Sequence, residues 1–265
     1  MVVFSDLDRS IIYSKRFLGK DKSELEIEIY KNENISYISK KTVKLIKQLQ
    51  KNIEFIPTTT RNIEQFKRIE FSKYDIDFKY AITSNGGNIL VNGQIDSEYK
   101  DYINQKLKNS IHIDEIMKLL EEYKNIKGIK KIRKADNIFA YIVVDNKIFD
   151  LKYIELFINK IKDLNWETYI NGTKIYFLPQ ELKKSTAIKY ICDKFGYKNT
   201  FGIGDSIMDK DMLDFCRSSY LLRHGDLVNS LSKENKYIIS RECGFRGSEE
   251  VLKYMEETGR RGIVL

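Results

Sequence analysis

Short apolar runs alternate with amphipathic stretches over the first third of the chain. Each apolar run has four or five residues, the length of a buried strand. In the stretch after Ser39, apolar residues recur at the spacing of a helix, and Ser39 suits the N-cap. The pattern predicts strands at 2–5, 53–56 and 79–83 and helices at 39–51 and 62–71. Strands that alternate with helices indicate a parallel sheet.

The pattern changes after residue 87. Asn92-Gly93 and Asn171-Gly172 each lie between apolar, extended stretches, where Asn-Gly is the strongest short signal for a β-hairpin. Between these turns, two stretches with helical spacing flank a run of strand type. The predicted elements are helices at 112–123 and 151–163 and a strand at 138–145.

Strand–helix alternation then returns, with helices predicted at 183–196 and 209–216 and strands at 200–204 and 219–223. We therefore expect an α/β fold, a Rossmann-like parallel-sheet core interrupted by an inserted α+β domain. The expected core is 1–87 and 179–265, and the expected insertion is 88–178.

The composition narrows the class of protein. A length of 265 residues is comfortable for two domains, and no run approaches the roughly 18 apolar residues of a membrane span. No leader pattern opens the chain, so we expect a cytoplasmic protein without a membrane contact. The three cysteines are too few and too far apart for a disulfide framework or a zinc site.

The net charge of +8 suits either nucleic acid or a phosphorylated small molecule. The lysines are scattered, often beside glutamates, and no basic block with interleaved aromatic residues is present. We therefore expect a small phosphorylated partner and no nucleic acid. A basic nucleic-acid-binding protein stays as the alternative from a different class, and the oligomeric state stays unknown.

Candidate chemistry begins where the first strand ends. Asp6 and Asp8 are two residues apart, so in an extended chain their side chains share a face. Two neighbouring carboxylates repel each other, which predicts a cation between or beside them. A metal ion is the obvious candidate.

Three further features have ordinary structural explanations when each is taken alone. The hydroxyls of PTTTR (57–61) suit an N-cap, Lys184 is one lysine among many, and Asp205 and Asp209 suit a strand–turn–helix junction. All of them lie where predicted strands end or the next helices begin. Ligands of parallel α/β sheets bind beyond those strand ends, so the features can converge on one crevice. Such a crevice suits a phosphoryl group, magnesium and an aspartate nucleophile.

At this point the chain resembles the haloacid dehalogenase-like (HAD) hydrolases. DLDRS (6–10), TTTR (58–61), KSTAI (184–188) and GDSIMD (204–209) are similar to the four ordered motifs of that superfamily. AITSNGGNIL (81–90) resembles the segment before the cap in the Cof-type and sucrose-phosphatase-like branch, whose α/β cap follows the third strand. DLDRSIIYS, SNGGNILVNGQID and RHGDL are also similar to HAD proteins encoded with tellurium-resistance-type operons.

The resemblance implies a magnesium-dependent phosphatase that hydrolyses a small phosphorylated metabolite, sugar- or nucleotide-like, through an aspartyl-phosphate. It makes Asp6 the nucleophile and a metal ligand, and Asp8 the general acid and base, with its carbonyl on the metal. Thr59 then binds the phosphoryl oxygens, and Lys184 neutralises charge on Asp6 and the phosphoryl group. For the remaining aspartates, Asp205 binds the metal, and Asp209 binds it or orients its waters and Lys184. A phosphomutase of the same chemistry is the alternative.

The chain departs from the usual motifs beside the predicted site. Arg9 stands where glycine is commonest, Ser10 where threonine is, Thr60 where glycine precedes the arginine, and Met208 where asparagine is frequent. These residues are expected at the entrance to the site, so the changes bear on which substrate the protein binds. Arg9 either reaches a second anionic group or forms an ion pair. The predicted substrate-binding residues are Arg9, Thr60, Arg61, Asn85, Gly86 and, in the inserted domain, Arg133, whose fork suits carboxylate or phosphate.

Overall fold

The computed structural model describes residues 1–19, 24–232 and 234–260. The chain forms two compact units: a core unit of Met1–Asp96 and Lys184–Leu265, and an inserted unit of Ser97–Lys183. The unit boundaries therefore differ from the predicted 88 and 178. Residues 88–96 stay with the core unit because β7 (Asn88–Val91) pairs with β6 (Tyr80–Thr83), and β8 (Gln94–Ile95) pairs with β7.

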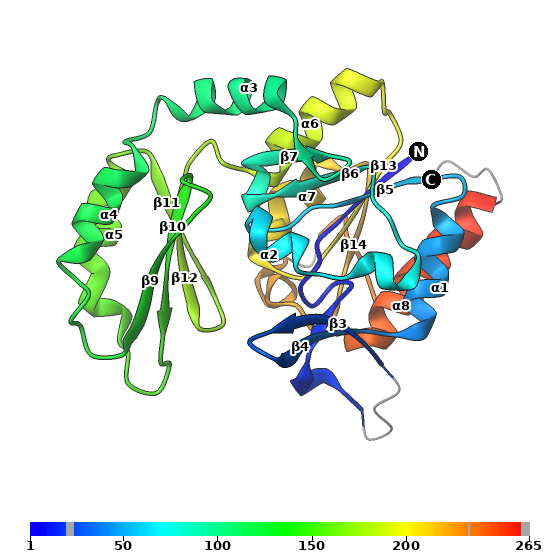
Figure 1. The fold of residues 1–265 in the computed structure, drawn as a ribbon, viewed down its shortest axis with the longest axis horizontal. Coiled ribbons are helices and arrows are strands. Elements are labelled where there is room, and N and C mark those ends of the chain that lie inside the picture. The colour runs from blue at the N-terminus through cyan, green and yellow to red at the C-terminus, as the bar shows by residue number, and fades with distance from the viewer. Residues whose placement is uncertain (20–23, 233, 261–265) are drawn as a thin grey trace. The chain divides into compact units, whose positions relative to one another are not determined.

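The core unit contains a parallel sheet with the strand order β15-β14-β13-β1-β5 (Figure 1). This arrangement confirms the α/β fold with a parallel-sheet core. The interior strand β1 is buried along its whole length and pairs on its two sides with β13 and β5. The strands are β1 (Val2–Ser5), β5 (Glu54–Pro57), β13 (Thr200–Gly204), β14 (Ser218–Leu221) and β15 (Ile238–Ile239).

Helices cover both faces of this sheet. Apolar residues of α1 (Lys40–Leu49) and α8 (Gly244–Arg260) form one cluster with Val3, Phe55 and Tyr220, so these two helices lie together on one face. On the other face α7 (Lys210–Phe215) packs on β13, and α6 (Lys184–Phe195) packs on α7. Ser39 caps α1 as predicted, since its hydroxyl accepts the Thr42 N–H at 2.9 Å. The pattern predicted α1, α6 and α7 within two residues or so at each end.

Two small antiparallel sheets flank the carboxyl edge. One has the order β2-β4-β3, with β2 (Tyr13–Ser14), β3 (Leu25–Tyr30) and β4 (Glu33–Ile38). The other is β6-β7-β8, whose Asn92-Gly93 turn has positive φ at both residues, as the hairpin signal predicts. The third predicted strand, β6, meets β5 through a single parallel bridge from Thr58 to Ile82. The helix predicted at 62–71 is shorter, because α2 (Ile63–Lys67) ends four residues before a 3-10 turn at Phe71–Tyr74.

The inserted unit has an antiparallel sheet with the order β11-β12-β10-β9. Figure 1 shows α4 (Ile113–Glu121) and α5 (Glu155–Lys162) on one face of it, and Phe157 of α5 packs edge-on against Phe177 at 4.9 Å between centroids. The predicted helix at 151–163 opens as a 3-10 turn, Leu151–Ile154. The other elements are α3 (Ser97–Leu107), β9 (Ile129–Ala135), β10 (Phe139–Val144), β11 (Trp166–Asn171) and β12 (Lys174–Pro179).

No helix within residues 1–19, 24–232 and 234–260 has the length and apolar character to cross a bilayer. All three cysteines are free, with Cys192 and Cys216 buried and Cys243 exposed.

Candidate active site

The carboxyl edge of the core sheet brings the predicted residues together. Asp6 directly follows β1, Thr59 comes two residues after β5, Asp205 directly follows β13, and Lys184 begins α6. After Asp6 the chain turns tightly, because the Leu7 carbonyl accepts the N–H groups of Ser10, Ile11 and Ile12 at 2.9–3.1 Å. Arg9 takes a left-handed φ of 64° inside this turn. The two carboxylates have different partners, Lys184 for Asp6 and Arg61 for Asp8.

Lys184 is fully buried between two carboxylates. Its Nζ donates to Asp6 Oδ1 at 2.8 Å and to Asp209 Oδ1 at 2.5 Å. Burial alone would lower the pKa of Lys184, but the carboxylates of Asp209 and Asp6 outweigh it and raise that pKa above its ordinary value. Lys184 therefore stays charged. Burial raises the pKa of Asp6, an effect that the Lys184 ammonium opposes.

Both carboxylate oxygens of Asp209 accept hydrogen bonds. Its Oδ2 accepts the backbone N–H groups of Asp205 and Ser206 at 3.0 and 2.9 Å and the Ser206 hydroxyl at 3.0 Å. Gly204 makes this close approach possible, because a Cβ there would lie 2.6 Å from the Asp209 Cβ. With Oδ1 on Lys184, Asp209 is placed to orient that ammonium.

The site has oxygen ligands that fit a hard divalent cation. Asp6, Asp205 and Asp209 are buried, and one carboxylate oxygen from each lies within 4.8 Å of the others. Asp205 Oδ2 is buried and accepts no hydrogen bond, although the Arg9 guanidinium lies 3.3 Å away. Burial and the Asp209 carboxylate raise the pKa of Asp205 well above its usual range, so a cation at this position would favour its ionised form. An all-carboxylate donor set is the type that Mg²⁺ prefers.

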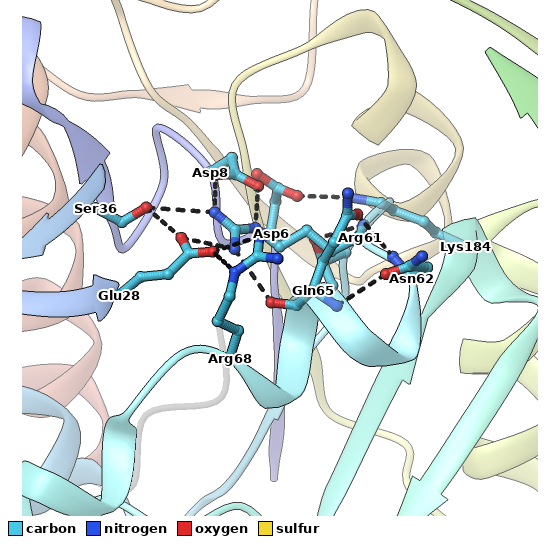
Figure 2. Close-up of polar contacts among 10 residues, drawn as sticks. Asp6, Asp8, Glu28, Ser36, Arg61, Asn62, Gln65, Arg68 and Lys184 are labelled. Carbon is cyan, nitrogen blue, oxygen red and sulfur yellow. Dashed lines mark hydrogen bonds and ion pairs between the residues drawn. The ribbon is translucent and has the colours of Figure 1, made fainter. Parts of the chain in front are cut away.

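Asp8 has a different cation, Arg61. Arg61 Nε and Nη2 donate to the two Asp8 oxygens at 2.7 and 2.8 Å, a bidentate pair (Figure 2). The same guanidinium contacts Glu28 at 2.9 Å and the Gln65 carbonyl at 3.3 Å. Burial would lower the pKa of Arg61, but Asp8 and Glu28 raise it. Arg61 was predicted to bind substrate, and in the structure its guanidinium already pairs with the carboxylates of Asp8 and Glu28. Its role in substrate binding stays a prediction.

Arg9 also has partners within the chain. Its Nε lies 3.3 Å from Asp205 Oδ2, and its Nη2 donates to the His224 carbonyl at 2.7 Å. The His224 ring accepts the Gly244 N–H at Nδ1, so its Nε2–H donates to the Arg9 carbonyl at 2.8 Å. Of the two possibilities for Arg9, the structure shows the ion pair. A contact of Arg9 with substrate stays a prediction.

Thr59 is fully buried, and its hydroxyl accepts the Arg61 N–H at 3.1 Å, which leaves the hydroxyl hydrogen for donation. Thr60 follows it and is half-buried. Three successive residues after β6, Ser84, Asn85 and Gly86, have positive φ. This segment is tied to the Thr59 loop, because the Asn85 N–H donates to the Thr59 carbonyl at 3.0 Å. The predicted substrate residues Thr60, Asn85 and Gly86 therefore lie beside Thr59.

A profile of the sucrose-6F-phosphate phosphohydrolase family matches residues 2–222, which is most of the chain. The chain belongs to this family. It is accordingly an HAD-like phosphoric monoester hydrolase of the sugar-phosphatase type. No curated protein matches the sequence significantly.

Solved structures share the fold over nearly the whole length. Sucrose-phosphatase from Synechocystis sp. PCC6803, solved with sucrose and phosphate, has a TM-score of 0.70 and 13% identity over 98% of each chain. An HAD subclass IIB sugar phosphatase has a TM-score of 0.63 and 14% identity, covering 97% of this chain and 98% of its own. An HAD-like hydrolase from B. subtilis has a TM-score of 0.61 and 13% identity, covering 96% and 99%. At these identities the likeness concerns the fold.

In this family member, Arg133 lies in β9 of the inserted unit and is exposed. The strand register aligns Arg133 with Tyr141, Tyr176 and Tyr169 across the four strands. Side chains alternate between the faces of a strand, and Phe177 points to the helices, so this row is on the face that the helices leave open. We call the row of Arg133, Tyr141, Tyr176 and Tyr169 the open-face row.

One residue of the site lies outside every predicted motif. Glu28 of β3 is fully buried and accepts bonds from the Ser36 hydroxyl, Arg61 and Arg68. Figure 2 shows its carboxylate joined by dashed lines to Ser36 and to the guanidinium groups of Arg61 and Arg68. Strand alternation gives no signal for it, since Glu28 would share an exposed face with Glu26. A register shift between these two residues instead turns Glu28 inward.

Proposed function

We propose that the protein is a magnesium-dependent phosphatase that releases phosphate from a small phosphorylated sugar through an aspartyl-phosphate on Asp6. The observation that carries this proposal is the buried contact of Lys184 with Asp6 at the carboxyl end of β1. A carboxylate held by a permanent cation beside the Thr59 hydroxyl suits nucleophilic attack on a phosphoryl group. Family membership supports the substrate class.

In the first step an Asp6 oxygen attacks phosphorus as the bond from phosphorus to the leaving oxygen breaks. The Lys184 ammonium and the Thr59 hydroxyl donate to the phosphoryl oxygens, where negative charge is spread in the transition state. Protonated Asp8 gives its proton to the leaving oxygen, and the sugar departs as an alcohol. In the second step Asp8 takes a proton from water, which attacks phosphorus and breaks the bond to Asp6.

Asp6 and Asp205 would hold Mg²⁺ through their carboxylates, and Asp8 through its carbonyl. When bound, the ion would neutralise charge on the carboxylates and the phosphoryl group. Asp209 acts on this site through Lys184, because both of its oxygens already accept hydrogen bonds.

The open-face row is our candidate for sugar recognition. Lys174 lies 5.4 Å from the Tyr141 ring centroid, so the face combines aromatic rings with positive charge. Tyr169 donates its hydroxyl to Glu167 at 2.5 Å on the same face. Rings, hydroxyls and a carboxylate suit the apolar faces and the hydroxyl groups of a sugar, and Arg133 suits a second anionic group.

Phosphate release from a panel of sugar phosphates tests this function. We expect release that requires Mg²⁺ and that Asp6→Asn abolishes while the fold persists, because an amide cannot form the acyl-phosphate. Asp193→Asn, the same change on the exposed side of α6, is the control and should keep full activity. A folded Asp6→Asn protein with more than a few per cent of wild-type turnover would disprove the assignment. Free phosphate that lags behind substrate loss would indicate a phosphomutase.

A further inference from the structure

We propose that Glu28 is a positioning residue for leaving-group protonation, acting through Arg61 on Asp8. The inference rests on the proposed function, in which Asp8 protonates the leaving oxygen. It assigns a role in the reaction to the β3–β4 hairpin, which lies outside the four motifs that carry the resemblance to the superfamily.

Four charged side chains form a continuous chain of contacts from Asp8 into the hairpin (Figure 2). Arg61 meets Asp8 through Nε and Nη2 and meets Glu28 Oε2 through Nη1 at 2.9 Å. Arg68 then closes the chain, with Nε and Nη2 each 2.8 Å from Glu28 Oε1. The Ser36 hydroxyl donates to Glu28 Oε2 at 2.5 Å. Both Glu28 oxygens are thereby engaged.

The side chains become more exposed from Glu28 through Arg61 to Asp8. The Glu28 side chain is 0% exposed and that of Arg61 12%, whereas that of Asp8 is 51% exposed. A half-exposed aspartate on a turn can adopt several rotamers, and this freedom would blur the position of the proton it donates. The bidentate fork of Arg61 fixes the plane of the Asp8 carboxylate. Glu28 supplies the buried anchor that fixes the fork.

Charge balance gives the same assignment. When all four are ionised, Asp8, Arg61, Glu28 and Arg68 carry two negative and two positive charges and are neutral together; when Asp8 holds the proton that it donates, Glu28 is the only negative charge among them. Without the Glu28 charge, Arg61 and Arg68 would be two cations in a partly buried region. Asp8 would then be the only carboxylate left among the four contacting side chains. Arg61 would then be free to shift towards solvent, and it would carry the proton-donating group with it.

The loss of kcat that we predict depends on the leaving group. A purely structural role of Glu28 would instead lower kcat equally on every substrate. When leaving oxygens are strongly basic, as in glucose 6-phosphate and phenyl phosphate, the departing group needs a proton. The nitrophenolate of p-nitrophenyl phosphate leaves without one. General acid catalysis typically raises the rate by about 10²- to 10⁴-fold. Partial misplacement of the acid can therefore lower kcat strongly on the substrates whose leaving group needs a proton.

The experiment compares kcat and KM of wild type and Glu28→Gln on p-nitrophenyl phosphate, phenyl phosphate and glucose 6-phosphate. We expect kcat to fall about tenfold or more on the last two, and less than about threefold on p-nitrophenyl phosphate, with KM unchanged within about threefold. Glu26→Gln, an exposed position of the same strand, should leave all three substrates unaffected.

Arg68→Gln separates positioning from hairpin stability. This variant breaks the outer contact of Glu28 but keeps the contact between Glu28 and Arg61, so it should show no selective loss. If Glu28→Gln does not fold, the charge-balanced double variant Glu28→Gln/Arg68→Gln should show the same selectivity. An equal loss on all three substrates, or a selective loss in Arg68→Gln, would overturn the role of Glu28. A wild-type protein that releases phosphate from none of the three and from no member of the sugar-phosphate panel would instead refute the proposed function, and the inference with it.

Discussion

The carboxyl edge of the core sheet and the open face of the inserted sheet both gather charged residues, but they hold them differently. At the core edge, Lys184 and Asp209 are buried, and each is fixed by two or more short hydrogen bonds. On the open face, Arg133 is exposed at the edge of its sheet, and Tyr141 beside it is half-buried. The charges at the core edge are fixed before any ligand arrives, whereas the exposed Arg133 side chain keeps rotamer freedom.

Under the proposed function, this difference corresponds to two tasks. Phosphoryl transfer needs charges that are already in place when the transition state forms, because reorganising them would add to the barrier. Choosing among sugars needs groups that can contact different hydroxyl patterns, and side chains on an open sheet face can adjust. We therefore expect changes at the core edge to act on kcat for every substrate. Changes on the open face should act on KM and on the ranking of substrates.

The largest expected effect is that of Lys184→Ala. It removes the cation from two buried carboxylates, so kcat should fall by about 10²- to 10³-fold. The free energy of unfolding should fall by about 3–5 kcal/mol, the usual effect of breaking a buried ion pair. Lys189→Ala, in the exposed pair with Asp193, should cost no more than about 0.5 kcal/mol and leave kcat unchanged. Steady-state kinetics and urea unfolding measure both quantities, and similar values for the two variants would remove the contrast.

Metal removal should stop turnover without affecting the inserted unit. We expect a chelator to abolish phosphate release and Mg²⁺ to restore it, while Ca²⁺, which is larger and takes more ligands, supports little. Asp205→Asn should raise the Mg²⁺ concentration for half-maximal activity by about tenfold or more, since it weakens one charged ligand. Asp214→Asn, at an exposed pair with Lys210, should keep the wild-type requirement. Full activity in chelator would contradict the metal assignment.

The smallest expected effect is on the open face. Arg133→Gln should raise KM for the preferred sugar phosphate by about tenfold, or 1.4 kcal/mol, and leave kcat on p-nitrophenyl phosphate unchanged. Lys134→Gln is its control, because the neighbouring residue points to the opposite face and pairs with Asp114. Comparing the two variants on one substrate panel measures the selectivity of this face. An unaltered ranking in Arg133→Gln would place substrate selection elsewhere.

The sequence predicted most of the core because short buried strands and capped helices are local signals. Asp6, Lys184, Asp205 and Asp209 lie up to 203 positions apart, yet Asp6 and Asp205 follow strands, Lys184 begins α6 and Asp209 directly precedes α7. The rule that parallel strands present ligand sites at their carboxyl ends was enough to bring them together.

Glu28 could not be predicted because its place depends on a register shift and on partners outside β3. Neither Arg61 nor Arg68 is near it in sequence, and alternation from Glu26 assigns it to solvent. The boundary at 88 was misplaced for a related reason. The Asn92-Gly93 hairpin was predicted correctly, but only its pairing with β6 shows that it belongs to the core unit.

The interior position of β1 has a consequence for synthesis of the chain. β1 can pair with β5 once about 60 residues exist, but its other neighbour, β13, begins at Thr200. At about 5–20 residues per second, one edge of this apolar strand lacks its native partner for roughly 10–40 s on the ribosome. The inserted unit is complete by Lys183 and can fold during that interval. An insertion between β5 and β13 therefore lengthens the time for which a nascent core depends on chaperones.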